Sequence, residues 1–192
     1  MPEQHGRSLI IRRLILPLAL LLANSVVATQ SLRAQSYAVL YSFIGAADGG
    51  VPTAGLIKDA AGTLYGTTWA GGAFGDGTLF ELDRSDNQTV LYSFQGGVDG
   101  ELPTAGLVRD EAGNLYGTTT IGGALYGTVF KLDTKGVETI LYSFTGLADG
   151  GNPQAGLVLD EAGYLYGTTF SGGVSGFGTI FKVDTSDRKS VV

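Results

Sequence analysis

The sequence contains no cysteine and only one histidine, His5. Without cysteine there is no disulfide framework and no thiolate ligand set. His5 lies in the leader-like start of the chain, so the remainder lacks the usual base of Ser-His-Asp and Cys-His catalysis and the nitrogen and sulfur ligands of zinc sites. We therefore expect no catalytic residues, no metal site and no cofactor in this chain.

Basic residues are scarce between residues 35 and 186, where six Lys and Arg stand against sixteen Asp and Glu, a net charge of −10. An acidic surface repels phosphate backbones, and no basic stripe offsets that repulsion. We expect no nucleic-acid partner. The charge is better explained as the means by which a glycine-rich, apolar chain stays soluble.

A long apolar run occurs only near the start, where three arginines precede an uncharged segment beginning at Leu14. Small residues follow, and Ala28 and Ala34 are plausible cleavage positions. A basic start, a short apolar centre and a small-residue exit predict a secretory signal peptide over residues 1–34. A retained membrane anchor is the alternative, which the shortness of the run disfavours.

The last six residues, 187–192, break the pattern at the point where another copy of "VLYSF" is due. Their sequence, "DRKSVV", resembles the translation of a common sequencing adapter. A natural basic tail is the alternative. We expect an adapter-derived tail, and hence a fragment that lacks further repeats and a C-terminal anchor.

A unit of about fifty residues is written three times. "LYSF" begins at Leu40, Leu91 and Leu141, and "LYGTT" begins at Leu64, Leu115 and Leu165. A fixed period of this length indicates supersecondary units that bury apolar surface only against their neighbours. The sequence predicts three tandem repeats within residues 35–186, namely 39–89, 90–139 and 140–186.

Each repeat contains four segments that favour extended structure, in the first copy 54–59, 63–69, 77–83 and 89–94. They are rich in β-branched and aromatic residues and contain no proline. Four short antiparallel strands per repeat predict an all-β fold of the β-propeller type, with about three blades and an incomplete ring. If the first segment of each repeat is the innermost strand of its blade, residues 38–43 form a lone outer strand. The third blade then lacks its outer strand. A β-solenoid is the rival architecture.

The pattern "AGLxxDxAGxLYGTTxxGG…GTxFxLD…LYSF" resembles the GloVer-type tandem repeat of exported bacterial proteins, also called choice-of-anchor repeats. The resemblance covers residues 39–184, and the segment from Asp110 to Thr118 also resembles the blade signature of NHL-like propellers. It implies export, residence at the cell surface through a variable C-terminal anchor, and no settled biochemical activity.

Candidate ligand-binding residues lie in the loops that enter the first and third segments of each repeat, which emerge on one face of a propeller. Asp48, Asp99 and Asp149 each precede a glycine in the longer loops. One interpretation is a ring of carboxylates that binds Ca²⁺ or sugar hydroxyls. The other, which we favour because every repeat shares the residue, is an aspartate that caps a turn.

Five aromatic residues stand outside the repeat pattern, at the end of the second segment and in the loop that follows it. They are Trp69, Phe74, Tyr126, Phe170 and Phe177. Variable aromatics on loops indicate recognition better than aromatics that recur at strand positions, which form the core.

These observations predict an exported, non-catalytic propeller-like repeat protein that acts as a cell-surface or extracellular binding or scaffolding module. The expected partners are a polysaccharide or an envelope protein, with membrane attachment only through a missing C-terminal anchor. The alternative is a carbohydrate-active enzyme whose catalytic residues lie in missing blades. A purely structural role also remains open.

Overall fold

The computed structural model describes residues 35–186, so the predicted signal peptide and adapter-derived tail lie outside the described residues. The contacts divide the chain into one unit ending at Ala38 and a second beginning at Val39, and the fold below belongs to the second. Within the described residues, no helix has the length and apolar character needed to cross a membrane.

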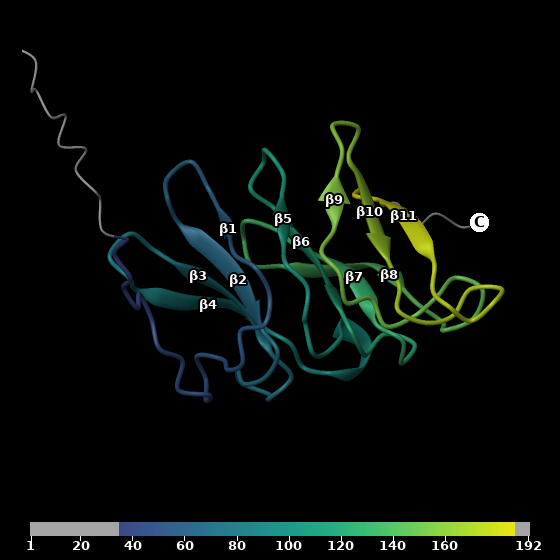
Figure 1. Ribbon diagram of the computed structural model, residues 1–192, viewed down its shortest axis with the longest axis horizontal. Coiled ribbons are helices and arrows are strands. Elements are labelled where there is room, and N and C mark those ends of the chain that lie inside the picture. The colour runs from purple at the N-terminus through teal and green to yellow at the C-terminus, as the bar shows by residue number, and fades with distance from the viewer. Residues whose placement is uncertain (1–34, 187–192) are drawn as a thin grey trace, which may run out of the picture. The chain divides into compact units, whose positions relative to one another are not determined.

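Three antiparallel sheets follow one another along the chain (Figure 1). Sheet 1 contains β1 (Ile57–Lys58), β2 (Leu64–Thr68), β3 (Thr78–Leu82) and β4 (Gln88–Ser93). Sheet 2 contains β5 (Val108–Arg109), β6 (Leu115–Thr119), β7 (Thr128–Leu132) and β8 (Glu138–Ser143). Sheet 3 contains β9 (Val158–Leu159), β10 (Tyr164–Thr168) and β11 (Ile180–Asp184), and a single 3₁₀ turn, η1, spans Gly97–Asp99. The predicted all-β, propeller-like architecture is confirmed.

The first hairpin of each repeat forms because an aspartate organises its turn. The Asp110 carboxylate accepts the backbone N–H of Asn114 at 2.8 Å and the hydroxyl of Tyr116 at 2.9 Å. Gly113 closes the turn at φ 94°, a conformation that glycine adopts without steric cost. Asp59 and Asp160 make the same two kinds of bond in sheets 1 and 3. The same aspartate and glycine chemistry therefore closes the first hairpin of every sheet.

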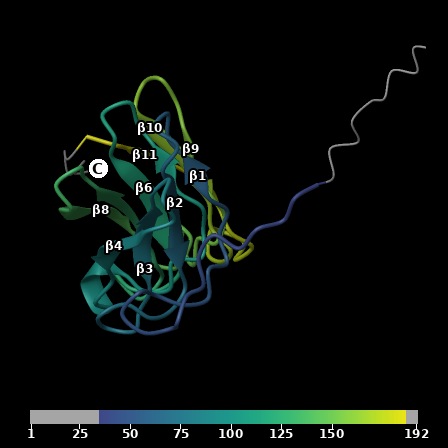
Figure 2. The same cartoon turned by 90° about the vertical axis from the view of Figure 1, so that its left-hand side faces the viewer.

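The first strand of each sheet is innermost. A Cβ added to Gly106 would lie 3.6 Å from the carbonyl oxygen of Gly55, and one added to Gly156 would lie 3.7 Å from that of Gly106. The segments leading into β1, β5 and β9 are thus neighbours. Figure 2 shows β1 and β9 on one side of the sheets, with β4 and β8 on the opposite side.

Apolar cores fill the spaces between consecutive sheets. Between sheets 1 and 2, Leu79 and Phe94 pack with Leu107 and Phe130, and Phe94 meets Phe130 edge to face at 5.2 Å. The core between sheets 2 and 3 repeats the arrangement, with the corresponding rings 5.0 Å apart. Each sheet therefore depends on its neighbours for burial, as the repeat period predicts.

The glycine in the second strand of each sheet is crowded by side chains from the segments on both sides of it. Gly117 pairs with Phe130 across β6 and β7, and a Cβ at residue 117 would lie 2.6 Å from the Phe130 ring and 2.9 Å from Leu107. The ring of the neighbouring strand thus lies over the glycine and fills the space that a side chain would take.

The prediction of a lone strand over residues 38–43 is wrong. No strand is assigned to this segment, although the equivalent segments form β4 and β8. Those strands pair with β3 and β7 of their own sheets, whereas residues 38–43 follow no such strand within the described residues. A strand without a partner for its backbone groups does not form. Within the described residues, sheet 3 has three strands.

Candidate functional site

Two families of loops meet on one face of the sheets, as predicted. The loops entering the inner strands and the loops after β2, β6 and β10 are joined by bridges between Gly50 and Ala70, Glu101 and Ile121, and Gly151 and Ser171. In the first repeat the N–H of Trp69 also donates to the carbonyl of Val51 at 3.0 Å. We call this surface the loop face, defined as residues 44–53, 95–104, 145–154, 69–77, 120–127 and 170–178.

The three predicted loop aspartates are used within their own loops. Asp48, Asp99 and Asp149 each accept the hydroxyl of the tyrosine seven residues earlier, at 2.9 to 3.0 Å. Each also accepts the backbone N–H of the residue four positions earlier, at 2.9 to 3.0 Å. Oxygens engaged in this way hold the loop closed, which is the turn-capping role favoured above.

The electrostatics of these tyrosine–aspartate pairs agree with a structural role. The hydrogen bond from the Ile44 backbone lowers the pKa of Asp48. Burial, followed by the hydrogen bond to Asp99, raises the pKa of Tyr92. An ionised aspartate beside a neutral tyrosine is therefore the stable state of the Tyr41–Asp48 and Tyr142–Asp149 pairs. Binding of Ca²⁺ or sugar hydroxyls by these carboxylates stays a prediction.

All five predicted aromatics lie on the loop face and are exposed, from 40% for Trp69 to 92% for Phe177. Trp69, Phe74 and Phe170 are between 40% and 71% exposed. Trp69 directly follows β2, and Phe170, at the equivalent position of the third repeat, lies two residues after β10. Because an exposed indole or phenyl ring is costly in water, rings that gather on loops indicate a surface for contact.

Tyr126 and Phe177 share another position of the repeat, since each directly precedes the glycine at the start of the third segment. Tyr126 places its ring against Gly146 and Gly151, which belong to the loop of the following repeat. Its carbonyl also accepts the N–H of Asn152 at 2.7 Å. Tyr126 therefore joins two repeats, and its role in ligand binding stays a prediction. Phe177 occupies the equivalent position in the third repeat and is almost fully exposed.

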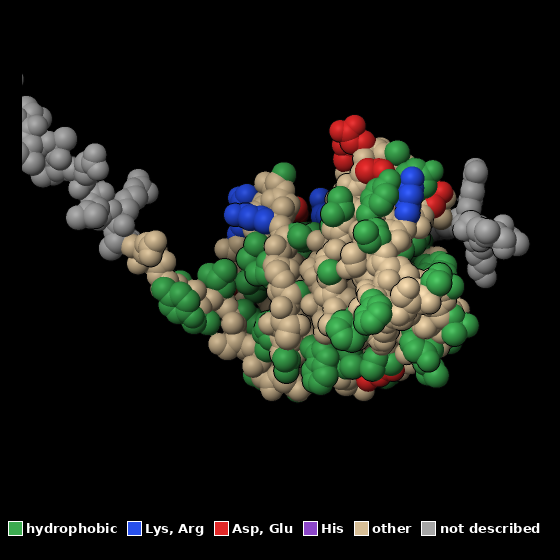
Figure 3. Space-filling model, turned by 45° about the vertical axis from the view of Figure 1, so that its right-hand side comes forward, with side chains coloured by type: hydrophobic (Ala, Val, Ile, Leu, Met, Phe, Trp, Pro, Cys, Tyr) green, Lys and Arg blue, Asp and Glu red, His purple; other side chains and the backbone are tan. Residues whose placement is uncertain are grey.

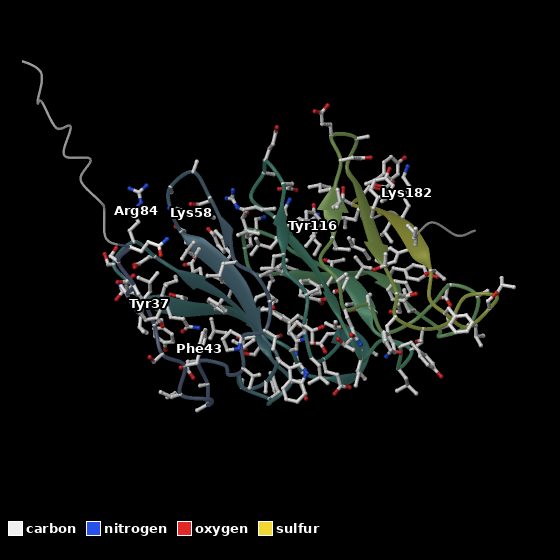
Figure 4. The ribbon with its side chains drawn as sticks, in the orientation of Figure 1. Tyr37, Phe43, Lys58, Arg84, Tyr116 and Lys182 are labelled. Atoms are coloured by element: carbon white, nitrogen blue, oxygen red, sulfur yellow. The ribbon has the colours of Figure 1, made fainter. Side chains whose placement is uncertain are left out.

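The loop face carries many exposed apolar side chains, whereas the six Lys and Arg residues of 35–186 all lie outside it. Figure 3 shows hydrophobic side chains over the lower loops and most Lys, Arg, Asp and Glu side chains at the upper end. Lys58, Arg84 and Lys182 lie at that upper end in Figure 4. Further exposed apolar side chains of the loop face are Val51, Val98, Leu125, Leu147 and Val174. The loop face also carries five carboxylates, those of Asp48, Asp76, Asp99, Glu101 and Asp149, so only the basic side chains are separated from the candidate binding surface.

Glu138, at the start of β8, is a titratable residue whose character the sequence did not reveal. Burial, and then the nearby Asp99 carboxylate, raise its pKa to about 7. One carboxyl oxygen of Glu138 and one of Asp99 are buried without a hydrogen-bond partner. Its counterpart in sheet 1 is Gln88, whose side-chain amide donates to the carbonyl of Asp48 at 3.0 Å. The sequence signal for this unusual glutamate is that the second repeat has Glu138 where the first repeat has Gln88.

Two hollows lie beside sheets 1 and 3, and the second reaches the loop face through Ala148 and Asp149. One, of about 540 Å³, is lined by residues that include Leu40, Leu64 and Arg84 beside sheet 1. The other, of about 330 Å³, lies along β11 and includes Tyr142 and Phe144. Among residues 35–186 no cluster of three or more His, Cys, Asp or Glu side chains is placed to hold a metal ion.

The solved structures that match this chain include two of low sequence identity. A luciferin-regenerating enzyme is 19% identical, with a TM-score of 0.46, over 72% of this chain and 46% of that one. A protein provisionally assigned as a gluconolactonase is 16% identical, with a TM-score of 0.37, over 59% of this chain and 40% of that one. The chain therefore spans less than half the length of either.

Comparison with families gives a match over nearly the whole sequence. The model of the Gloeobacter/Verrucomicrobia repeat matches residues 23–192, which include all three sheets. No curated protein matches the chain. The match agrees with the resemblance carried by the "LYGTT" and "LYSF" motifs. The chain belongs to the Gloeobacter/Verrucomicrobia repeat family.

Proposed function

We propose that this propeller-like repeat domain is an exported, non-catalytic binding module whose loop face binds polysaccharide. The observation that carries the proposal is the group of exposed aromatic rings on that face, Trp69, Phe74 and Phe170. Their planar faces suit the apolar faces of sugar rings, and an exposed aromatic group on loops is a typical recognition surface.

The way in which the rings are held supports binding. Trp69 and Phe170 follow strands of their sheets, and their backbone N–H groups bond to Val51 and Asn152 in the adjoining loop. Rings fixed at two repeats of a rigid array lose little conformational freedom when they contact an extended ligand. A polymer with its own repeating unit can contact both, which increases avidity without any deep pocket.

The arrangement of carboxyl groups supports a role without catalysis. Glycoside hydrolysis needs two carboxyl groups, one of them kept protonated. The repeated aspartates of the turns and loops hold backbone N–H groups, and such bonds lower the pKa of Asp48, Asp133 and Asp160. Glu138 has a raised pKa, but its counterpart Gln88 occupies the same place with a structural hydrogen bond.

Export is supported by the start of the sequence and by the resemblance to exported repeat proteins. The basic segment, the apolar run and the small residues that follow have the order of a secretory signal. Cell fractionation after expression of the full chain tests this. Recovery of an unprocessed chain in the cytoplasm alone contradicts export.

Binding is tested with the full chain and insoluble polysaccharides, namely cellulose, chitin and peptidoglycan, in sedimentation assays. We expect Trp69→Ala and Phe170→Ala each to weaken binding by about ten-fold, because each removes a ring from the contact. Arg84→Ala, at the charged end, is the matched control and should bind as the parent does. Binding that both ring variants retain in full, or no binding to any of these or to a glycan array, overturns the proposal.

A further inference from the structure

The loop face carries negative charge and no positive charge of its own. Its residues include five carboxylates but no Lys, Arg or His. The carboxylates are those of Asp48, Asp76, Asp99, Glu101 and Asp149. Because no basic residue of the face offsets them, an anion that approaches this surface meets repulsion.

Two of these carboxylates keep their charge while they hold their loops closed. The hydrogen bond from the Ile44 backbone lowers the pKa of Asp48. At Asp149, burial acts to raise the pKa, but the hydrogen bonds from Thr145 and Tyr142 outweigh it and lower the pKa. A carboxylate whose oxygens accept hydrogen bonds stays ionised at neutral pH. The turn-capping role and the repulsion of anions are therefore compatible.

Asp76 and Glu101 add charge at one place, the junction between the first two repeats. The Asp76 carbonyl accepts the N–H of Leu102 at 3.0 Å, so the loops that carry Asp76 and Glu101 are neighbours. Both residues are partly exposed. The second and third repeats have Tyr126 and Phe177 in place of Asp76, and the first and third repeats have glycine in place of Glu101. These two charges thus distinguish this junction from the next one.

The loop that carries Asp76 also carries two of the exposed rings. Trp69 and Phe74, which are 40% and 58% exposed, belong to the same loop, residues 69–77. A bridge between Gly71 and Asp76 folds this loop back on itself. A polymer that stacks on the rings therefore passes close to Asp76. Charges interact over about 10 Å at 0.1 M salt and about 30 Å at 0.01 M, so charged groups on such a polymer are within reach.

We propose that the loop face selects uncharged polysaccharides and rejects anionic ones, with Asp76 and Glu101 as the residues that determine this specificity. The inference rests on the proposed polysaccharide binding and narrows its ligand. The rings contact sugar rings of either kind, and the carboxylates discriminate by repulsion. Recognition of an anionic polymer uses Arg or Lys beside its carboxylates or sulfates, and the residues of this face include neither.

The test uses pairs of soluble polymers that share one backbone and differ in charge. Isothermal titration calorimetry measures binding of the full chain to hydroxyethylcellulose and carboxymethylcellulose, or to glycol chitin and carboxymethyl chitin where the sedimentation assays select chitin. At about 20 mM salt we expect the parent to bind the uncharged polymer at least about ten-fold more tightly. At about 0.5 M salt, which screens the carboxylates, the difference should fall below about three-fold.

Two double variants separate the charge of the loop face from the charge of the whole chain. Asp76→Asn with Glu101→Gln removes two charges from the loop face. Glu111→Gln with Glu161→Gln, the matched control, removes two from exposed hairpin turns before β6 and β10, which lie opposite the loops in Figure 1. Only the first pair should raise the affinity for the charged polymer relative to the uncharged one, by about three- to five-fold at low salt. Circular dichroism establishes that both keep the β fold, and the salt dependence of the parent decides the question if one does not.

The outcomes distinguish this inference from the proposed function. Equal binding of the two polymers at low salt, or a preference that salt does not weaken, overturns the inference alone. Equal effects of the two double variants assign the rejection to the net charge of the chain and also overturn it, as does a loop-face variant without effect. Binding to peptidoglycan alone, a polymer whose peptides carry carboxylates, contradicts it as well. Failure to bind any glycan overturns the proposed function and this inference together.

Discussion

β7 in the middle sheet and β11 in the last sheet carry nearly the same residues in very different surroundings. β7 is buried at four of its five positions, whereas no residue of β11 is fully buried and its exposure alternates along the strand. Each strand has apolar side chains on both faces, but only β7 has a sheet on both sides and a fourth strand along its edge. The difference shows that the repeat carries half of each interface and that neighbours supply the rest.

The largest expected loss of stability comes from removing a phenyl ring at a complete interface between sheets. Removing the equivalent ring at an incomplete interface should cost less. Phe94 is fully buried between sheets 1 and 2, and Phe94→Ala should lower the free energy of unfolding by about 3–5 kcal/mol. Phe43 makes the same edge-to-face contact, with Phe80 at 5.0 Å, but is only half-buried. Phe43→Ala should therefore cost less than half as much. Urea denaturation measures both, and equal losses would contradict the comparison.

Glycine in the second strand gives a second test. Gly117→Val should cost about 3 kcal/mol, because Phe130 and Leu107 occupy the space and lie inside a closed core. Gly167→Val creates the same clash with Phe181, but β11 is an edge strand and that ring can turn toward solvent. We expect about half the loss.

The control for both glycine variants is Lys135→Ala, an exposed change in the turn before β8. Thermal unfolding followed by circular dichroism compares the three variants. A melting temperature for Gly117→Val no lower than that of Lys135→Ala would show that the second strand is not crowded.

A backbone position shared by the repeats gives the next effect in size. Val51 and Asn152 both precede a proline in the left-handed region, at φ 57° and 55°. This conformation costs a β-branched residue more than it costs asparagine. Asn152→Val should therefore lose about 2 kcal/mol, since it also removes the hydrogen bond from Ser171 at 2.8 Å.

The reverse exchange in the first repeat, Val51→Asn, should stabilise the chain by about 1 kcal/mol. Urea denaturation of the two single variants tests this, because the free energy of unfolding should fall in Asn152→Val and rise in Val51→Asn. A loss of stability in Val51→Asn would mean that the apolar side chain, not the backbone conformation, governs this position.

The strands and turns could be predicted from the sequence because they depend on short-range patterns. The "LYGTT" strands and the Asp-to-Gly turns recur with constant chemistry, and the structure places them as β2, β6 and β10 and their hairpins. The hydrogen bonds from Tyr92 to Asp99 and from Tyr142 to Asp149 could also have been predicted, since both pairs are seven residues apart in the sequence.

Features that depend on a neighbouring repeat could not be predicted from the pattern alone. Residues 38–43 have the sequence of a strand, yet pairing also requires a strand beside them. Tyr126 was predicted as a ligand contact because it varies between repeats, and its ring also rests on the next loop, a contact that the pattern did not indicate. Variation along a repeat array thus marks contacts between repeats as well as contacts with ligands.

The smallest expected effect distinguishes sheets 1 and 2 through pH. The pKa of Glu138 is raised to about 7 in the folded chain, from an ordinary value of 4.5, first by burial and then by Asp99. The folded chain therefore binds more protons than the unfolded chain between these values, and stability falls as pH rises from about 4.5 to 7. Solvent reaches part of the side chain, so we expect a loss on the order of 1 kcal/mol.

Glu138→Gln should remove that pH dependence and give the stability of the protonated form above pH 7, because it restores the residue found in sheet 1. There, Gln88 donates to the Asp48 carbonyl at 3.0 Å, a bond that an ionised glutamate cannot make. Urea denaturation of parent and variant at pH 5 and pH 8 provides the comparison. An equal decline in both proteins would assign the pH dependence to other carboxyl groups and would leave the two sheets alike in this respect.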